Sequence, residues 1–162
     1  MNPKIQKVNL QNLSDMQISF SASNPFENLE YFQAMEVSDS ASEKTGWIPN
    51  HLGELENGKL NSFLPLYKKL NSYGEFIFDQ QWANALQQTG RSYYPKFLTA
   101  IPFTPCEGER ILAPNNEKKI QHIDSCIDLL KEEEVERVKV KLTKEMRKPA
   151  QPTKVKENPR VL

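Results

Sequence analysis

The chain has 162 residues, 38% hydrophobic and 26% charged, which is enough apolar material for one folded domain. Lys plus Arg and Asp plus Glu balance at 21 each, so the net charge gives no general attraction to DNA or to an anionic membrane. No window approaches the roughly 18 apolar residues that cross a bilayer, and the N-terminus lacks a signal-peptide core. We therefore expect a soluble, cytoplasmic protein without a membrane span.

The first 35 residues predict one strand and one helix. Residues 4–20 hold two short apolar patterns, and only the second alternates as a half-buried strand does: Met16, Ile18 and Phe20. Asn24 is a good N-cap, Pro25 fits the first helical position, and Glu27 completes a capping box. This helix should run to about Met35, with a core face formed by Phe26, Leu29, Phe32 or Tyr31, and Met35.

Residues 47–66 predict an irregular hairpin. Asn57 and Gly58 accept the positive φ of a type I′ turn between strands at 47–55 and 59–66. Pro49 and Pro65 cannot donate to a ladder, so each should lie at a strand edge, a bulge or a strand end.

The middle of the chain predicts a turn at 71–75, a short helix over 80–89 ending at Gly90, and a buried strand over 97–101. Residues 102–105 are too rich in proline to extend that strand, so they should form a rigid loop.

The C-terminal part begins with a helix from Asn116, predicted from apolar residues spaced by three and four: Ile120, Ile123, Ile127 and Leu130. Either Asn115 or Asn116 can cap it. Residues 131–162 predict a charged helical extension followed by a disordered tail. We therefore divide the chain into a folded part, 1–130, and an extension, 131–162. The two cysteines, Cys106 and Cys126, have no CxxC spacing and should be reduced, and His51 and His122 each stand alone, which favours structural roles over a metal site.

Seven short motifs occur in an order that resembles one protein family. They are NPF (24–26), GWIPNHL (46–52), PLY (65–67), NSYGEFIFD (71–79), WA (82–83), YYPK (93–96) and IPFTP (101–105). Together they resemble the N-terminal region of the bacterial FemAB-like predicted N-acyltransferases of the GNAT superfamily. The resemblance covers about residues 24–113 and does not extend into the tail.

The resemblance implies an α/β (α+β) fold: part of a GNAT-like domain with a mixed or antiparallel sheet, flanking helices, a C-terminal helix and a disordered tail. It also implies transfer of an acyl or aminoacyl group to an amine in peptidoglycan biosynthesis. In the complete family member the donor is acyl-CoA or aminoacyl-tRNA, and the acceptor is an amine-bearing small molecule or cell-wall precursor.

The acyl-donor site expected of such an enzyme is absent from this sequence. A GNAT enzyme holds the donor pyrophosphate on a glycine-rich turn at a helix N-terminus. The nearest match, residues 87–91, has a lone glycine at the C-terminal end of a helix, where the dipole repels anions. We therefore expect no cofactor to be bound and interpret the chain as a truncated member. A truncated sheet exposes an edge and apolar surface that a homodimer can cover.

Glu75 and Asp79 are the candidate catalytic residues. Their spacing of four brings the two carboxylates near one another in a helix or in a strand. One interpretation is a base or a seat for the substrate amine. The other, which we prefer because aspartate caps helices well, is an N-cap for Asp79 and a turn contact for Glu75.

Aromatic side chains concentrate in the same region and are candidates for substrate binding, although core packing explains most of them: Trp47, Tyr67, Tyr73, Trp82, Tyr93 and Tyr94. Lys96, together with Arg91, can meet an anionic group. Two functions stay open at this point. One is a partial N-acyltransferase, and the other is a non-catalytic binding module that keeps the substrate side of the fold.

Overall fold

The computed structural model describes residues 4–12, 17–18, 22, 24–77, 79–133 and 138–140. Within these ranges the chain forms eight strands: β1 Ile5–Lys7, β2 Gln17–Ile18, β3 Trp47–Pro49, β4 Leu52–Glu56, β5 Lys59–Leu64, β6 Tyr67–Lys69, β7 Lys96–Thr99 and β8 Val138–Val140. The α-helices of the same ranges are α1 Leu29–Val37, α2 Gln80–Gln88 and α3 Asn116–Glu132. This mixture confirms the predicted α+β class.

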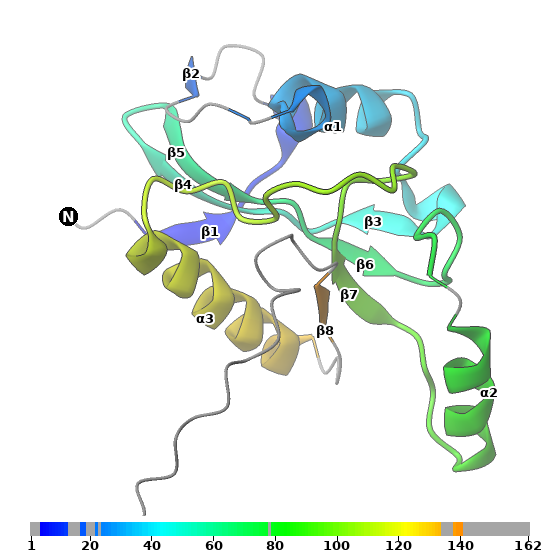
Figure 1. Cartoon of the computed structure of the whole chain (residues 1–162). Coiled ribbons are helices and arrows are strands. Elements are labelled where there is room, and N and C mark those ends of the chain that lie inside the picture. The colour runs from blue at the N-terminus through cyan, green and yellow to red at the C-terminus, as the bar shows by residue number, and fades with distance from the viewer. Residues whose placement is uncertain are drawn as a thin grey trace, which may run out of the picture.

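The strands form two four-stranded sheets with the orders β1-β4-β5-β2 and β3-β6-β7-β8. Most neighbours run antiparallel, whereas β2 is parallel to β5 and β8 is parallel to β7. Both sheets are therefore mixed, as predicted. Figure 1 shows α1 and α3 on opposite sides of the strands and α2 projecting away from them.

The hairpin at Asn57-Gly58 is confirmed, because both residues have positive φ (51° and 75°) and join β4 to β5. A bulge lies between Glu54 and Leu55. The chain just before β4 and the chain just after β5 belong to the second sheet, where they form β3 and β6 and pair with each other. Pro49 ends β3 and Pro65 directly follows β5. The prolines thus lie at strand ends, as predicted, at the point where the chain changes sheets.

Two hydrophobic cores occupy opposite faces of the strands. Leu29 and Phe32 of α1 pack with Phe63 and Leu98 in one core, and Cys126 and Leu129 of α3 pack with Phe97 and others in the second. Phe97 and Leu98 are neighbours in β7, so the alternation of a strand distributes them to the two faces. Burial of this apolar surface provides the main stabilisation of the fold.

The start of the first helix differs from the prediction. Asn24 caps as expected, its Oδ1 accepting from the Phe26 amide, but Pro25–Glu27 form a separate 3-10 turn and α1 begins only at Leu29. The break lies at Asn28, whose ψ of 143° is extended. The Glu27 carboxylate accepts a hydrogen bond from the Glu109 amide across the fold. Of the predicted face, Leu29 and Phe32 are buried and Phe26 is 43% exposed.

Helix α3 begins where predicted, with Asn115 accepting from the Lys118 amide. Its buried row, however, is His122, Cys126 and Leu129, whereas Ile120, Ile123 and Ile127 are 58%, 48% and 44% exposed. The apolar spacing therefore identified the helix and not its buried face. Polar His122 is buried instead because Ser62 offers it a partner.

Near both ends of the chain, the structure differs from the secondary structure predicted from the sequence. Ile5–Lys7, to which no strand was assigned, form β1. Gln17–Ile18 form β2, while Met16 and Phe20 of the predicted strand lie outside the described residues. Val138–Val140 form a strand beside β7, so the predicted helical extension is wrong there. The predicted disordered tail, residues 149–162, also lies outside the described residues.

Candidate functional site

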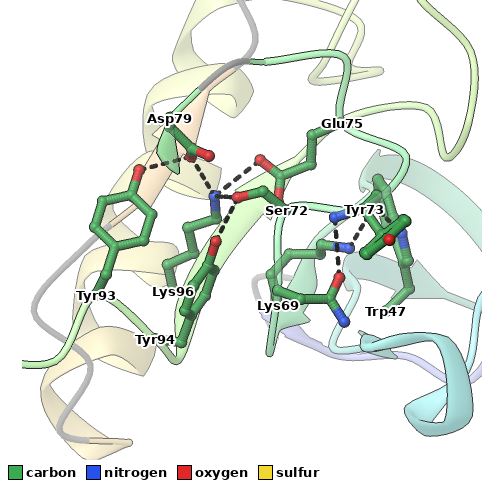
Figure 2. Close-up of polar contacts among 10 residues, drawn as sticks. Trp47, Lys69, Ser72, Tyr73, Glu75, Asp79, Tyr93, Tyr94 and Lys96 are labelled. Carbon is green, nitrogen blue, oxygen red and sulfur yellow. Dashed lines mark hydrogen bonds and ion pairs between the residues drawn. The ribbon is translucent and has the colours of Figure 1, made fainter. Parts of the chain in front are cut away.

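The candidate site is centred on the ammonium group of Lys96, the first residue of β7. This buried group donates to Ser72 Oγ at 2.9 Å, to Glu75 Oε2 at 2.9 Å and to Asp79 Oδ2 at 2.8 Å (Figure 2). An ammonium has three hydrogens, so these contacts use all of them. Two carboxylates and one lysine are thereby held together almost without solvent contact.

The turn between β6 and α2 delivers the carboxylates to Lys96. Gly74 has a φ of +74°, and a Cβ at this position would lie 2.5 Å from the ring of Phe103. Only glycine therefore fits here, for both conformational and steric reasons. The tight turn brings Glu75 back toward the strand, and Asp79 follows it immediately before α2.

Two tyrosines flank the cluster on the other side. Tyr93 Oη donates to Asp79 Oδ2 at 2.7 Å, and the hydroxyls of Tyr94 and Ser72 are 2.6 Å apart. The Lys96 ammonium lies 4.9 Å and 5.3 Å from the two ring centroids. Burial, and secondly the hydrogen bond to Asp79, raises the pKa of Tyr93 to about 12. The phenol is therefore protonated at neutral pH and acts as a donor.

A pocket of about 600 Å³ adjoins the cluster through these tyrosines. It is lined by α2 and the segment after it: Ala83, Asn84, Gln87, Gly90, Arg91, Ser92, Tyr93 and Tyr94. The lining combines aromatic rings, side-chain amides and the guanidinium of the exposed Arg91. Its size lies within the range of small-molecule sites.

A second buried lysine, Lys69, lies next to the Lys96 cluster. Lys69 of β6 is buried, its Nζ donates to the Tyr73 carbonyl at 3.1 Å, and it lies 3.6 Å above the ring centroid of Trp47. The indole of Trp47 donates to the same carbonyl at 2.9 Å (Figure 2). Burial lowers the pKa of Lys69 to about 7; neighbouring Glu75 acts to raise it, and Lys96 lowers it further.

The structure brings most of the predicted site residues together. Glu75, Asp79, Tyr93, Tyr94 and Lys96 form the cluster, and Trp47 and Tyr73 meet at Lys69 beside it. Asp79 occupies the predicted N-cap position of α2, but its side chain makes no cap hydrogen bond and binds Lys96 and Tyr93 instead. Tyr67 instead lies in the core against Trp47, and Trp82 is 73% exposed on α2.

Sequence reasoning missed Ser72 and Lys69. Ser72 lies in a predicted turn, where serine is common and carries no specific signal. Lys69 offered a signal, because it lies two residues after Tyr67 and hence on the same side of a strand. A lysine that shares the buried face of a strand needs a partner there.

The two histidines are held inside the fold. His51 Nδ1 accepts from the Leu66 amide at 3.0 Å, and its Nε2 lies 2.6 Å from Glu36 Oε1. His122 Nε2 lies 2.8 Å from Ser62 Oγ. Both cysteines are free, as predicted. Among the residues that the structure describes, no three His, Cys, Asp or Glu side chains are grouped to hold a metal ion.

Comparison with known proteins identifies the family of the chain. The FemAB-like family model, described as peptidoglycan biosynthesis/recognition, matches residues 4–156. The chain belongs to this FemAB-like family. The match extends beyond 24–113 at both ends, so the expectation that the tail falls outside the family was wrong; β8 lies in this added part.

No curated protein and no solved structure matches the chain. In the described ranges, no helix has both the length and the apolar character needed to cross a membrane.

Proposed function

We propose that this chain forms the acceptor-binding side of a FemAB-like N-acyltransferase, in which an acyl or aminoacyl group passes to the amine of a cell-wall precursor. Family membership supports the reaction class. The observation that carries the proposal is the convergence of two buried carboxylates, Glu75 and Asp79, beside tyrosines that line a pocket of about 600 Å³.

The pocket and the cluster offer different chemistry to the acceptor. Tyr93 and Tyr94 present aromatic surface and hydroxyls, and Asn84 and Gln87 present amides that can bind hydroxyl or peptide groups. Arg91 can pair with a carboxylate or phosphate. Glu75 and Asp79 provide the negative potential that attracts an ammonium group. The acceptor would therefore bind with its amine toward the carboxylates and its remaining groups in the pocket.

A non-catalytic binding module is the second candidate, and one observation favours it. All three hydrogens of Lys96 are engaged by side chains of the chain itself, and Tyr93 also bonds to Asp79. These contacts already occupy one oxygen of each carboxylate, which suits binding better than proton abstraction. Both candidates require the same acceptor site and differ only in the chemistry performed there.

Calorimetric titration tests the shared site. A soluble muropeptide with a free amine should bind the full chain, and the same muropeptide with its amine acetylated should bind more weakly. Glu75→Gln should weaken binding of the free amine by at least about tenfold, because a charged hydrogen bond contributes roughly 1.5–3 kcal/mol. Asp128→Asn, at an exposed pair with Lys131, is the matched control.

The outcomes separate the possibilities. Equal affinity for free and acetylated muropeptides would refute the role of the carboxylates. Acyl-CoA should give no binding heat, as expected for a chain without a donor site, and tight binding of acyl-CoA would overturn that expectation. Transfer of an acyl group to the bound muropeptide by this chain would exclude the binding-module candidate.

A further inference from the structure

The cluster and the neighbouring Lys69 together hold two carboxylates and two lysines, and these four groups are not evenly paired. Lys96 contacts both Glu75 and Asp79, at 2.9 and 2.8 Å. Lys69 has no carboxylate within salt-bridge distance among the described residues; it donates to the Tyr73 carbonyl and lies over the Trp47 ring. Lys96 therefore pairs with both carboxylates and balances one of their two negative charges, while Lys69 contributes its charge from a distance.

One carboxylate oxygen of Glu75 is not engaged in a hydrogen bond among the described residues. Its Oε2 binds Lys96, but its Oε1 is buried and has no hydrogen-bond partner among the described residues. A buried carboxylate oxygen without a donor is costly, and such atoms are rare in folded proteins. The free oxygen belongs to the same carboxylate that faces Lys69 electrostatically. It is the natural place for an additional cation.

Charge counting links these two features. With Lys69 protonated, two ammonium groups balance two carboxylates, and a further cation would leave the cluster with an excess positive charge. With Lys69 neutral, the cluster carries one net negative charge that a bound ammonium would balance. The charged groups that face Lys69 are Glu75, from the turn after β6, and Lys96, from β7; β3 contributes the uncharged ring of Trp47.

We infer that Lys69 is a charge switch for acceptor binding, releasing its proton to solvent when the ammonium of the acceptor pairs with the free oxygen of Glu75. This inference rests on the proposed function and adds a regulating residue to the same site. Lys69 is a positioning residue in this scheme, because it acts on the acceptor through Glu75 and does not touch it.

Release of the proton also loosens the segment that covers the site. Glu75 is 2% exposed, so an ammonium reaches it only when the turn at 71–77 moves. Lys69 holds this turn through the Tyr73 carbonyl, and a neutral amine donates a weaker hydrogen bond than an ammonium. The outer side of the turn faces solvent, with Tyr73 79% exposed and Phe76 59% exposed. Deprotonation therefore favours both opening and cation binding.

Proton-linked calorimetry on the full chain tests the switch. Titration of the free-amine muropeptide in two buffers of different ionisation enthalpy should show release of about half a proton per bound amine at pH 7, where Lys69 is about half protonated. Affinity should be about tenfold lower at pH 6 than at pH 8. Lys69→Met should abolish both effects, whereas Lys68→Met, the neighbouring lysine paired with Glu133, should leave both unchanged.

A second measurement keeps Lys69 in place. In a Trp82→Phe variant, Trp47 is the single tryptophan, and its ring lies 3.6 Å from Lys69 Nζ. Its fluorescence should titrate with a midpoint near pH 7, and muropeptide added at pH 6.5 should shift the signal toward its high-pH value.

The results separate this inference from the proposed function. Amine binding without proton release, together with a Trp47 signal that does not respond to the muropeptide, would overturn the switch and leave the acceptor site intact. Failure of the free-amine muropeptide to bind at any pH would overturn the proposed function and the switch with it.

Discussion

Two buried polar regions of this protein are built differently. The Lys96 cluster gathers ionised groups from the turn after β6 and from β7, beside a pocket, and leaves Glu75 Oε1 without a described partner. The pair of His51 and Glu36 lies in the core between α1 and the strands. Among the described residues, the first region keeps an unpartnered acceptor for the proposed ligand, whereas His51 in the second has both ring nitrogens engaged.

The geometry of His51 defines its state. Because Nδ1 accepts from the Leu66 amide, its single proton lies on Nε2 and is donated to Glu36. Both ring nitrogens are thus engaged, and the ring packs against Phe63 and Tyr67 with centroids 5.2 and 4.8 Å away. Complete engagement inside a packed core indicates a structural role, whereas incomplete engagement beside a pocket indicates a binding role. The following substitutions test this distinction.

The largest effect is expected from Lys96→Met. Loss of the ammonium leaves Glu75 and Asp79 as uncompensated buried charges, which costs roughly 3–5 kcal/mol in unfolding free energy. Urea denaturation at pH 7 measures this loss. The triple variant Lys96→Met/Glu75→Gln/Asp79→Asn, which removes all three charges, should recover much of it. A triple variant no more stable than the single one would show that uncompensated charge is not the cause.

His51→Ala should lower the unfolding free energy by about 2–4 kcal/mol, because it creates a core cavity and leaves Glu36 and the Leu66 amide without their partner. Its affinity for the amine-bearing muropeptide should equal that of the parent chain under conditions where both are folded. A stable variant with weakened amine binding would contradict the division between the two regions.

His122 provides an intermediate case, since its Nε2 contacts Ser62 but its Nδ1 is buried without a partner among the described residues. Burial, and secondly Lys118, lowers its pKa from 6.5 to about 4. The unfolded chain therefore binds the proton more readily, and stability falls as the pH drops from 6.5 toward 4. His122→Gln, which stays neutral, should reduce the loss between pH 7 and 4.5 by about 2–3 kcal/mol. Urea denaturation of both proteins at the two pH values measures these losses. If the parent chain and His122→Gln lost the same unfolding free energy, the pKa of His122 would be that of an ordinary histidine.

Local patterns predicted much of the fold. The turn at Asn57-Gly58, the prolines at strand ends and the cap at Asn115 depend on residues close in the sequence, and the structure contains all of them. Strands β1 and β8 were missed because each is only three residues long and is defined by its pairing partner, β4 or β7. Pairing between distant segments leaves almost no local signal.

The candidate site, too, was predictable where it depends on residue type and short spacing, and not where it depends on contacts between distant segments. The aromatic residues and carboxylates could be selected by type, and Glu75 and Asp79 were expected to lie near one another. Their convergence on Lys96 spans 17 residues or more and depends on the path of α2 out and back. Asp79 holds the N-cap position, yet its side chain does not cap, because a buried lysine is a stronger partner for a carboxylate than orphan amides at the start of a short, solvent-exposed helix.

The smallest effect is expected where ionised groups meet at the surface. Glu133 accepts from Lys7 at 3.0 Å and from Lys68 at 2.8 Å, linking the end of α3 to both sheets. The hydrogen bond from Lys68, followed by that from Lys7, lowers the pKa of Glu133, so its contribution is present at neutral pH and lost as the carboxylate protonates in acid. Because solvent screens the group, Glu133→Gln should cost less than about 1 kcal/mol at pH 7.

Salt distinguishes this surface pair from the buried cluster. The small cost of Glu133→Gln should shrink further in 1 M NaCl, measured by urea denaturation, because the Debye length is then only about 3 Å. The cost of Lys96→Met should persist in the same salt, since Lys96 is only 1% exposed. If both costs fell together, the Lys96 cluster would be as accessible to solvent as Glu133, and its role as a shielded seat for an ammonium would be untenable.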